Sequence, residues 1–283
     1  MCNPIPASES SPKSLSPQEQ LPILYRDEHI VVVNKPSGLL VHRSEIDRHE
    51  TRFALQIVRN QIGQHVFPVH RLDKPTSGVL LFGLNKAVAR ILSEQLSNGH
   101  IEKHYLAITR GYAPESIYVD YPLKEEQDKY TDNKARKDKP PQQAQTQFCR
   151  LATTELPVEI EGYPQSRYSM VACKPTTGRK HQIRRHLKHI GHPIIGDAKH
   201  GRGRHNRYFK QHLDAGRLLL HAGRLSIRHP TDNRLMEFVA PLDSMYLNLV
   251  DRFQWRNHLP SYLSQDMPKG CEMGAASTAK NRE

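Results

Sequence analysis

Short runs of β-branched and apolar residues, most of them bounded by turn-forming residues, recur along the middle of the chain. Valine and isoleucine favour extended backbone, and short runs of them between turn residues are typical of strands. Few segments with a helical period interrupt these runs, so we expect an α+β fold with a mixed, mostly antiparallel sheet and flanking helices. The segments predicted as strands are Ile30–Val33, Gly78–Gly83, Tyr105–Arg110, Arg167–Cys173 and Leu218–Ile227.

Two segments have the apolar period of a helix. Asn85 can cap a helix that ends at Gly99. A second helix is predicted from about residue 179 to residue 189, ending near Gly191. On this second helix, one stripe is apolar (Ile183, Leu187, Ile190) and the opposite side is basic (His181, Arg185, Lys188).

The two ends of the chain differ in composition from its middle. Residues 1–20 and 261–283 are polar and cannot bury enough apolar surface to fold, so we predict two disordered tails. Residues 21–260 contain no Ser- or Gly-rich linker and no internal repeat, which indicates one domain. Within it, residues 124–140 form a run of mixed charge, which is either a solvated loop or an RNA-contacting insertion.

The chain is strongly basic. It has 41 Lys and Arg against 29 Asp and Glu, a formal net charge of +12, which attracts polyanions. Its four cysteines are far apart and form no CxxC pair, which argues against a disulfide scaffold or a zinc ribbon. No apolar run has the ~20 residues that span a membrane, and residues 1–20 lack a signal-peptide core. We therefore expect a cytoplasmic protein.

One stretch, His70–Gly78, places a single carboxylate among basic side chains at a turn that contains proline and glycine. Asp73 is flanked by Arg71 and Lys74, and nearby cations favour the ionised form of a carboxyl group. Such a group serves as an acceptor or nucleophile rather than as a proton donor. The alternative is a turn aspartate that only satisfies backbone amides.

The sequence of His70–Gly78 closely resembles the active-site signature of the RluA-type pseudouridine synthases. Similar segments extend over roughly residues 21–245: Ile23–Glu28, Asn34–Gly38, Lys103–Tyr105, Thr177–Arg184 and His192–Asp197. The resemblance implies a long bent sheet around a central cleft and an isomerase that converts uridine to pseudouridine without a cofactor. No glycine-rich nucleotide-binding motif is present, in agreement with that chemistry. Only about 20 residues precede the predicted domain, so we expect no N-terminal S4 RNA-binding module of the kind some family members carry.

The resemblance also implies roles for three residues. Asp73 is the catalytic carboxylate, and the sequence leaves open whether it acts as a nucleophile or as a base. Arg184 pairs with this aspartate, although a basic helix could equally direct it to a phosphate. Tyr105 matches an active-site tyrosine on which a flipped uracil stacks and which can take part in proton transfer, whereas by itself it would be a half-buried strand residue.

Other basic residues are candidates for contact with RNA. Arg71 matches the residue that fills the gap left by the extruded uridine, a role suited to a planar guanidinium. His70 is a structural or RNA-contacting neighbour. The candidate phosphate contacts are Lys35, Arg179, Lys180, Arg185 and Lys188.

A metal site is the rival interpretation of the histidine-rich segment. His181, His186, His189 and His192 lie close together, and a spacing of three residues can place two histidines on one helical face. The interspersed arginines and Lys188 would repel a divalent cation, so we expect no metal.

The substrate is suggested by resemblance alone. Segments similar to family members that act on uridine 65 in the T-arm stem of tRNA are Val41–Ser44, Asp120–Leu123, Leu151–Thr153 and His200–Gly201. We therefore expect tRNA as the partner of a monomeric enzyme that needs no membrane and no protein partner. The alternatives are an enzyme of the same family that acts on rRNA and an inactive RNA-binding protein with this fold. Intact Asp73, Tyr105 and Arg184 argue against the inactive protein.

Overall fold

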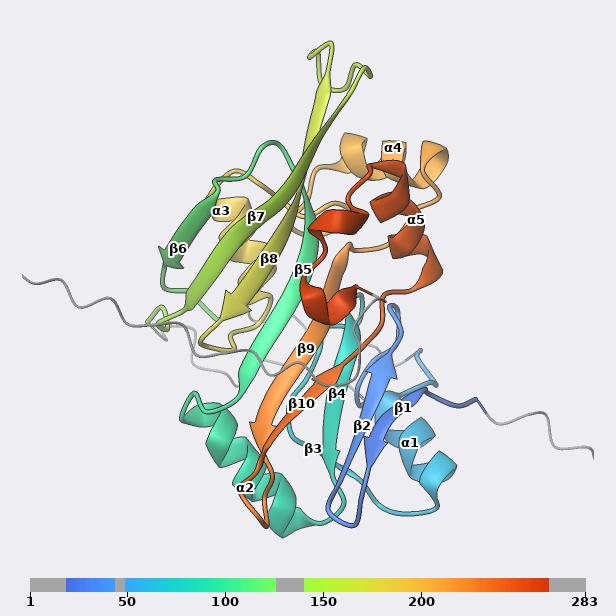
Figure 1. The fold of residues 1–283 in the computed structure, drawn as a ribbon, viewed down its shortest axis with the longest axis vertical. Coiled ribbons are helices and arrows are strands. Elements are labelled where there is room, and N and C mark those ends of the chain that lie inside the picture. The colour runs from blue at the N-terminus through green and yellow to red at the C-terminus, as the bar shows by residue number, and fades with distance from the viewer. Residues whose placement is uncertain (1–18, 44–48, 126–139, 265–283) are drawn as a thin grey trace, which may run out of the picture.

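A ten-stranded sheet forms the centre of the molecule in the computed structural model, which describes residues 19–43, 49–125 and 140–264 (Figure 1). Eight strands follow one another in the order β1-β2-β4-β9-β5-β8-β7-β6, while β10 pairs with β9 and β3 with β4. The strands are β1 (Ile23–Arg26), β2 (Ile30–Lys35), β3 (Phe67–Pro68), β4 (Ser77–Gly83), β5 (Glu102–Arg110), β6 (Ser116–Asp120), β7 (Gln145–Leu156), β8 (Ser166–Pro175), β9 (Leu220–Arg228) and β10 (Leu235–Val239).

One pair in the sheet is parallel, and it lies at the centre. β4 runs parallel to β9 over two residue pairs, Ser77 with His221 and Gly78 with Ala222, whereas the other named pairs are antiparallel. Gly78 has φ +117, and a Cβ there would lie 2.2 Å from the carbonyl oxygen of Ala222. This crossing therefore requires glycine. It also fixes the strand that directly follows the Asp73 turn.

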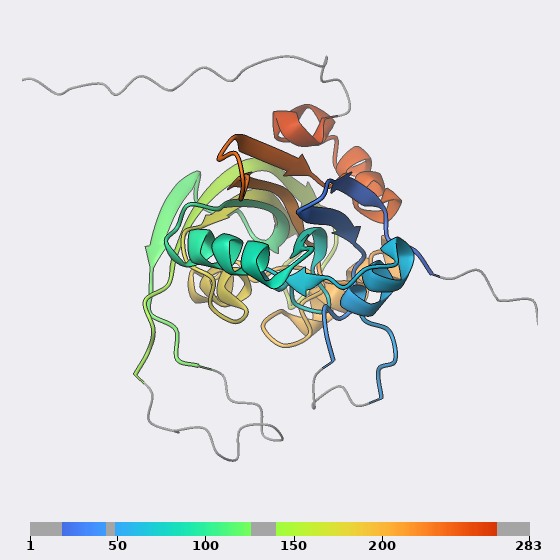
Figure 2. The same ribbon diagram turned by 90° about the horizontal axis from the view of Figure 1, so that it is seen from below.

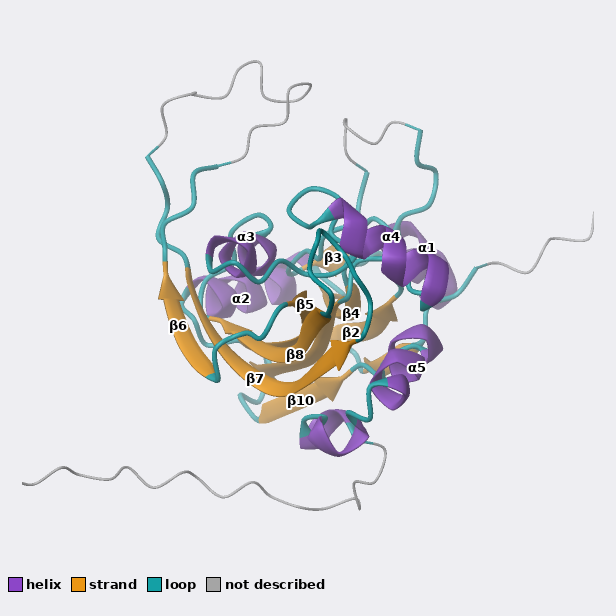
Figure 3. Ribbon diagram, turned by 90° about the horizontal axis from the view of Figure 1, so that it is seen from above, coloured by secondary structure: helices purple, strands orange, loops and turns teal. Residues whose placement is uncertain are grey.

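Helices cover both sides of the curved sheet (Figures 2 and 3). They are α1 (Ala54–Ile62), α2 (Lys86–Ser97), α3 (Gln182–His189), α4 (Gly203–His212) and α5 (Ser244–Arg252), followed by two short 3-10 turns. At the β5–β8 part of the sheet, α3 and α4 lie on one side, and α5 with the 3-10 turns lies on the other. The described helices include none that is long and apolar enough to cross a bilayer.

The apolar core is divided in three. Alternate residues of β2 and β4 point to opposite faces, so Val31 and Leu80 pack with α1 while Val32 and Leu81 pack with α2. The largest cluster joins β5 and β8 to residues of α3, α4 and α5. Tyr105 packs against both the largest cluster and the α1 cluster, at the border between the two parts of the sheet.

The predicted α+β class with a mostly antiparallel sheet is confirmed. Four of the five predicted strand segments lie within strands, and the fifth, Leu218–Ile227, begins two residues before β9. Asn85 caps α2 by accepting the backbone N–H of Val88 at 2.9 Å. The second predicted helix begins at Gln182 rather than near residue 179, because residues 177–181 form a turn. No predicted segment corresponds to α1, α4, α5, β1, β3, β6, β7 or β10.

The predicted C-terminal tail begins too early. Residues Ser261–Leu263 form a 3-10 turn, and the side chain of Leu263 is buried in the largest cluster. Apolar contact therefore extends the ordered domain past residue 260. The remainder of this tail, the N-terminal tail up to residue 18 and most of the charged 124–140 segment lie outside the described residues.

Candidate active site

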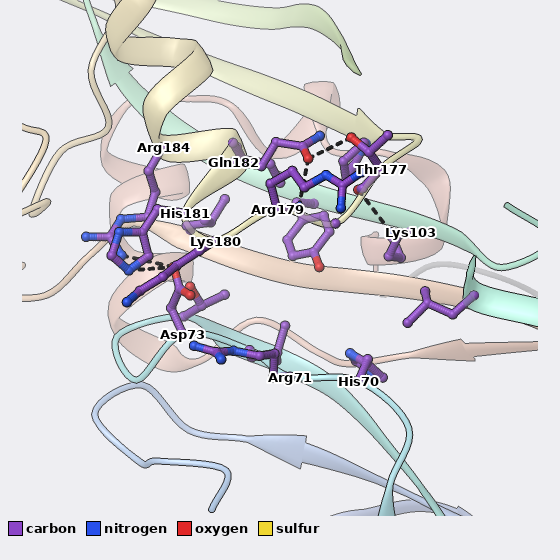
Figure 4. Close-up of a pocket in the computed structure, with 18 of the residues that line it drawn as sticks. His70, Arg71, Asp73, Lys103, Thr177, Arg179, Lys180, His181, Gln182 and Arg184 are labelled. Carbon is purple, nitrogen blue, oxygen red and sulfur yellow. Dashed lines mark hydrogen bonds and ion pairs between the residues drawn. The ribbon is translucent and has the colours of Figure 1, made fainter. Parts of the chain in front are cut away.

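Asp73 lies in the turn between β3 and β4, at the edge of a cavity of about 510 Å³ (Figure 4). The backbone N–H of Thr76 donates to the Asp73 carbonyl at 2.9 Å and closes the turn. The carboxylate itself is 18% exposed and accepts no bond from that turn in the hydrogen bonds described. It is therefore directed into the cavity, which is not the arrangement of an aspartate that satisfies its own turn.

Arg184 reaches this carboxylate from α3, on the other side of the cavity (Figure 4). Its Nη1 donates to Asp73 Oδ2 at 2.9 Å, while Nε and Nη2 donate to both oxygens of Asp197 at 2.7 and 2.9 Å. Burial opposes the charge on Arg184, but the hydrogen bonds and charges of Asp197 and Asp73 outweigh burial and raise its pKa. The guanidinium is thus a permanent cation shared between two carboxylates.

Asp197 is the residue of the site that the sequence analysis did not assign. Its side chain is fully buried, and its Oδ1 also accepts the backbone N–H groups of Lys199 and His200 at 2.9 Å. Burial alone would raise its pKa, but the bonds from Arg184 and the two amides lower it below its ordinary value. Asp197 belongs to the His192–Asp197 segment that resembles the family. The resemblance therefore marked this position but implied no role for it.

Tyr105, on β5, is half-buried and lines the same cavity. Burial, and then the charges of Asp73 and the Cys173 thiol, raise the pKa of its phenol far above the usual value. The phenol therefore stays protonated, which suits a stacking surface and a hydrogen-bond donor rather than a proton acceptor.

His181 completes the wall beside Asp73, and His200 contacts it from outside the cavity lining. The Nε2 atom of His181 is 3.9 Å from Asp73 Oδ2, and its Nδ1 is 3.1 Å from His200 Nε2. His181 has φ 55, a left-handed conformation that is uncommon for a residue with a side chain. The strained backbone at the start of α3 thus directs this imidazole at the carboxylate.

The 177–182 turn that precedes α3 is held by side chains. Gln182 accepts from the Thr177 hydroxyl at 2.7 Å and from the Arg179 amide at 2.9 Å. The Nζ of buried Lys103 donates to the Thr177 carbonyl at 3.2 Å, and burial lowers the pKa of Lys103 to about 8. These contacts fix the wall of the cavity opposite the Asp73 turn.

Four of the predicted RNA contacts lie at the cavity, namely His70, Arg71, Arg179 and Lys180. Arg71 and Arg179 are exposed and Lys180 is half-buried. Arg185 and Lys188 do not line the cavity, although Lys188 is exposed farther along α3.

The positions of His70 and Lys35 favour structural roles. His70 Nε2 accepts the Leu81 N–H at 3.2 Å, and burial lowers the pKa of His70 to about 4, so the ring is neutral. For Lys35, the expected phosphate contact is wrong. This side chain is fully buried and its Nζ donates to the carbonyls of Pro36, Leu39 and Lys74 at 2.9, 2.8 and 3.2 Å. Because all three donors of its ammonium group bind carbonyls, Lys35 anchors the loop that follows Asp73 and is not accessible to a phosphate.

The histidines considered as metal ligands are dispersed. His186 bonds Thr146 and the Tyr121 carbonyl, His192 lies 3.0 Å from the Arg110 carbonyl, and His189 stacks on Tyr121. Across residues 19–43, 49–125 and 140–264, no three His, Cys, Asp or Glu side chains are grouped to hold a metal ion.

Comparison with known proteins gives a consistent result. The RNA pseudouridylate synthase family model matches residues 29–189, more than half of the chain. A "tRNA pseudouridine synthase C" from Pasteurella multocida is 50% identical over 235 residues, 83% of this chain and 97% of that protein. One with the same name from Pectobacterium carotovorum is also 50% identical, and the match spans 88% of this chain but only 66% of that protein.

Solved structures resemble the whole domain. "Human RNA Pseudouridylate Synthase Domain Containing 4" superposes with a TM-score of 0.61 at 26% identity, covering 82% of this chain and 93% of that one. "Human RNA Pseudouridylate Synthase Domain Containing 1" gives a TM-score of 0.60 at 26% identity, covering 85% and 97%. By its family match, its relatives and its fold, the chain belongs to the RNA pseudouridine synthase family.

Proposed function

We propose that this protein converts uridine to pseudouridine in tRNA, at position 65 of the T-arm stem, with Asp73 as its catalytic carboxylate. The observation that supports the proposal most is the contact of Asp73 with a doubly anchored guanidinium, at 2.9 Å, in a cavity that also contains Tyr105. The tRNA substrate is supported by the names of relatives that are about half identical to this chain.

The reaction needs no external reactant. The bond between ribose C1′ and uracil N1 breaks, a bond from C1′ to C5 forms, and the proton lost from C5 is balanced by one gained at N1. Asp73 either bonds to the substrate or removes a ribose proton, and both steps need an ionised carboxylate next to the sugar. A cavity that excludes water would destabilise that charge, and Arg184 offsets the loss of hydration.

Arg184 itself is kept in place by Asp197. Its two bonds to Asp197 fix the plane of the guanidinium and leave Nη1 for Asp73. Tyr105, as a protonated phenol, would stack on the uracil and donate a hydrogen bond to it.

A uridine within a stem must leave the base stack to reach the cavity, at a cost of a few kcal/mol. Exposed Arg71, two residues before Asp73, is placed to fill the vacated space and to donate hydrogen bonds to the unpaired base. Arg179 and Lys180, on the opposite wall, would bind the flanking phosphates.

The test compares Asp73→Asn with Asp251→Asn, a surface control whose carboxylate pairs with Arg256 on the far side of the sheet. Tritium release from C5-labelled tRNA transcripts should fall by at least about 10³-fold in Asp73→Asn and should not change in the control. Normal release from Asp73→Asn would contradict the assignment. Mapping pseudouridine in RNA from a deletion strain tests the position, and loss of a modification from rRNA instead of the T arm would contradict the substrate.

A further inference from the structure

Between Asp197 and Asp214, helix α4 and the residues that precede it carry charge of one sign only. Residues 198–213 include five Lys and Arg side chains and no acidic one: Lys199, Arg202, Arg204, Arg207 and Lys210. The solvent-facing sides of helices usually mix both signs, because unlike charges three or four residues apart stabilise a helix. The composition of α4 is therefore not the usual one of a solvated helix.

The charges of α4 lie on its outer face. His205, Phe209 and Leu213 form the buried stripe of this segment, with Phe209 and Leu213 in the largest core cluster. Arg204 and Arg207 lie on the opposite, exposed side. Exposed Lys210 continues the same side by one further turn. The apolar contacts hold the helix on the domain and leave the cations directed outward.

These cations have no acidic partners among the described residues. Arg202, Arg204, Arg207 and Lys210 form no ion pair there, whereas other exposed cations do: Arg52 with Glu19, Arg167 with Glu155 and Arg256 with Asp251. Two of the four occupy the N-cap and the first turn of α4, where a positive charge opposes the helix dipole. The stability of the helix therefore does not explain them.

The helix is connected directly to the active site. Its preceding loop begins at Asp197, which holds Arg184, and includes His200, which contacts His181 in the cavity wall. Both α3 and α4 lie on the same side of the sheet (Figures 1 and 2). A helix of this length extends for about 15 Å, which is long enough to face several successive phosphates of an RNA strand.

We propose that the outer face of α4 binds the phosphate backbone of the substrate tRNA outside the stem-loop that carries the target uridine. The inference rests on the proposed function and extends it. The active site receives one flipped nucleotide, and α4 binds the neighbouring part of the same molecule. Affinity for a whole tRNA would then exceed that for its excised arm.

The experiment uses the full-length protein with Arg204→Glu, Arg207→Glu and Lys210→Glu combined. Dissociation constants are measured over a series of salt concentrations for a full tRNA transcript and for its excised T-arm stem-loop. For full tRNA, we expect a 10- to 100-fold loss of affinity and a salt dependence reduced by about two to three phosphate contacts. For the stem-loop, we expect a change of less than twofold. Turnover at saturating tRNA should remain normal.

A matched control reverses Arg26, Arg228 and Arg234, three exposed cations at the end of β1 and at the β9–β10 turn. This turn is at the opposite end of the molecule from α4 (Figure 1). Unchanged tRNA affinity in the α4 variant, an equal loss for both RNAs, or an equal loss in the control would each contradict the proposal. If the wild-type protein forms no pseudouridine in tRNA, the proposed function is wrong. If the wild type is active and the α4 variant binds tRNA normally, only the proposal for α4 is wrong.

Discussion

At the scale of single residues, the site depends on a buried cation shared by two carboxylates. Arg184 and Asp197 are both at most 6% exposed, and each neutralises a charge that could not otherwise be buried. Removing one member leaves the other unpaired, whereas a surface pair would lose little. This difference gives a prediction for stability as well as for activity.

Replacing Asp197 with Asn should destabilise the protein by roughly 3–5 kcal/mol at pH 7, because Arg184 loses its buried counter-charge. Urea unfolding measures the difference, and Asp251→Asn, which removes an exposed carboxylate, is the control. The pKa of Asp197 is lowered in the folded protein, so its contribution is present above the unfolded value of 3.8 and decreases as the pH falls below it. Equal stability of the variant and the wild type at pH 7 would contradict the ion-pair interpretation.

Tyr105→Phe should retain activity within about tenfold of wild type, and Tyr105→Leu should lose about 10²-fold or more. The reason is that the phenol stays protonated, so the ring surface matters more than the ionisable oxygen. Single-turnover rates on saturating RNA distinguish the two variants. A Phe variant as inactive as the Leu variant would show that the hydroxyl takes part in the chemistry.

Buried His221 should make the fold less stable in acid. Its ring is buried between the Ser77 hydroxyl and the Ala240 carbonyl, and burial lowers its pKa to about 4. Between about pH 6.5 and pH 4, this histidine is therefore protonated in the unfolded chain but not in the folded one. The free energy of unfolding thus decreases as the pH falls through this range, by about 3 kcal/mol for this residue. Unfolding free energies across this range should depend less steeply on pH in His221→Gln. An unchanged slope would contradict the prediction.

At the scale of elements, the parallel crossing of β4 and β9 is the least tolerant point of the sheet. A Cβ at Gly78 would lie 2.2 Å from the backbone of Ala222, and the positive φ adds strain. Gly78→Ala should therefore destabilise the protein by several kcal/mol, which thermal unfolding would detect. Gly99→Ala is the matched control, since Gly99 also has positive φ but has nothing within 4 Å. It should cost about 1 kcal/mol, and equal losses would contradict the role of the crossing.

At the scale of the whole molecule, the C-terminal segment closes the largest core cluster. Trp255 is 2% exposed and its indole N–H donates to the Thr153 carbonyl at 3.1 Å. A chain that ends after Gln254 loses this side chain together with Leu263, so it should be insoluble or melt at a much lower temperature. A chain that ends after Ser264 keeps every described contact and should melt like the full protein. Similar melting of both truncations would contradict this account.

The sequence predicted much of the molecule, and the failures have physical causes. Strands with continuous apolar runs, such as β2 and β4, were identified because both of their faces are buried. β7 was not, because its half-buried residues alternate without a β-branched run. Within α4 the buried residues are His205 and Phe209, so its stripe contains too few apolar residues for a pattern to detect. Lys35 shows why site residues cannot all be predicted from the sequence. Only the fold reveals that three carbonyls accept the protons of its ammonium group.

Because Asp73 and Asp197 share the guanidinium of Arg184, positions 184 and 197 cannot easily change one at a time during evolution. Replacing the carboxylate at position 197 alone would leave an unpaired cation in the interior, and replacing Arg184 alone would leave an unpaired anion there. Neither intermediate is easily tolerated, so descendants should keep both residues or exchange them together. These two sites, thirteen residues apart, should thus vary as a unit, and a library that randomises both positions at once should recover paired solutions that single replacements miss.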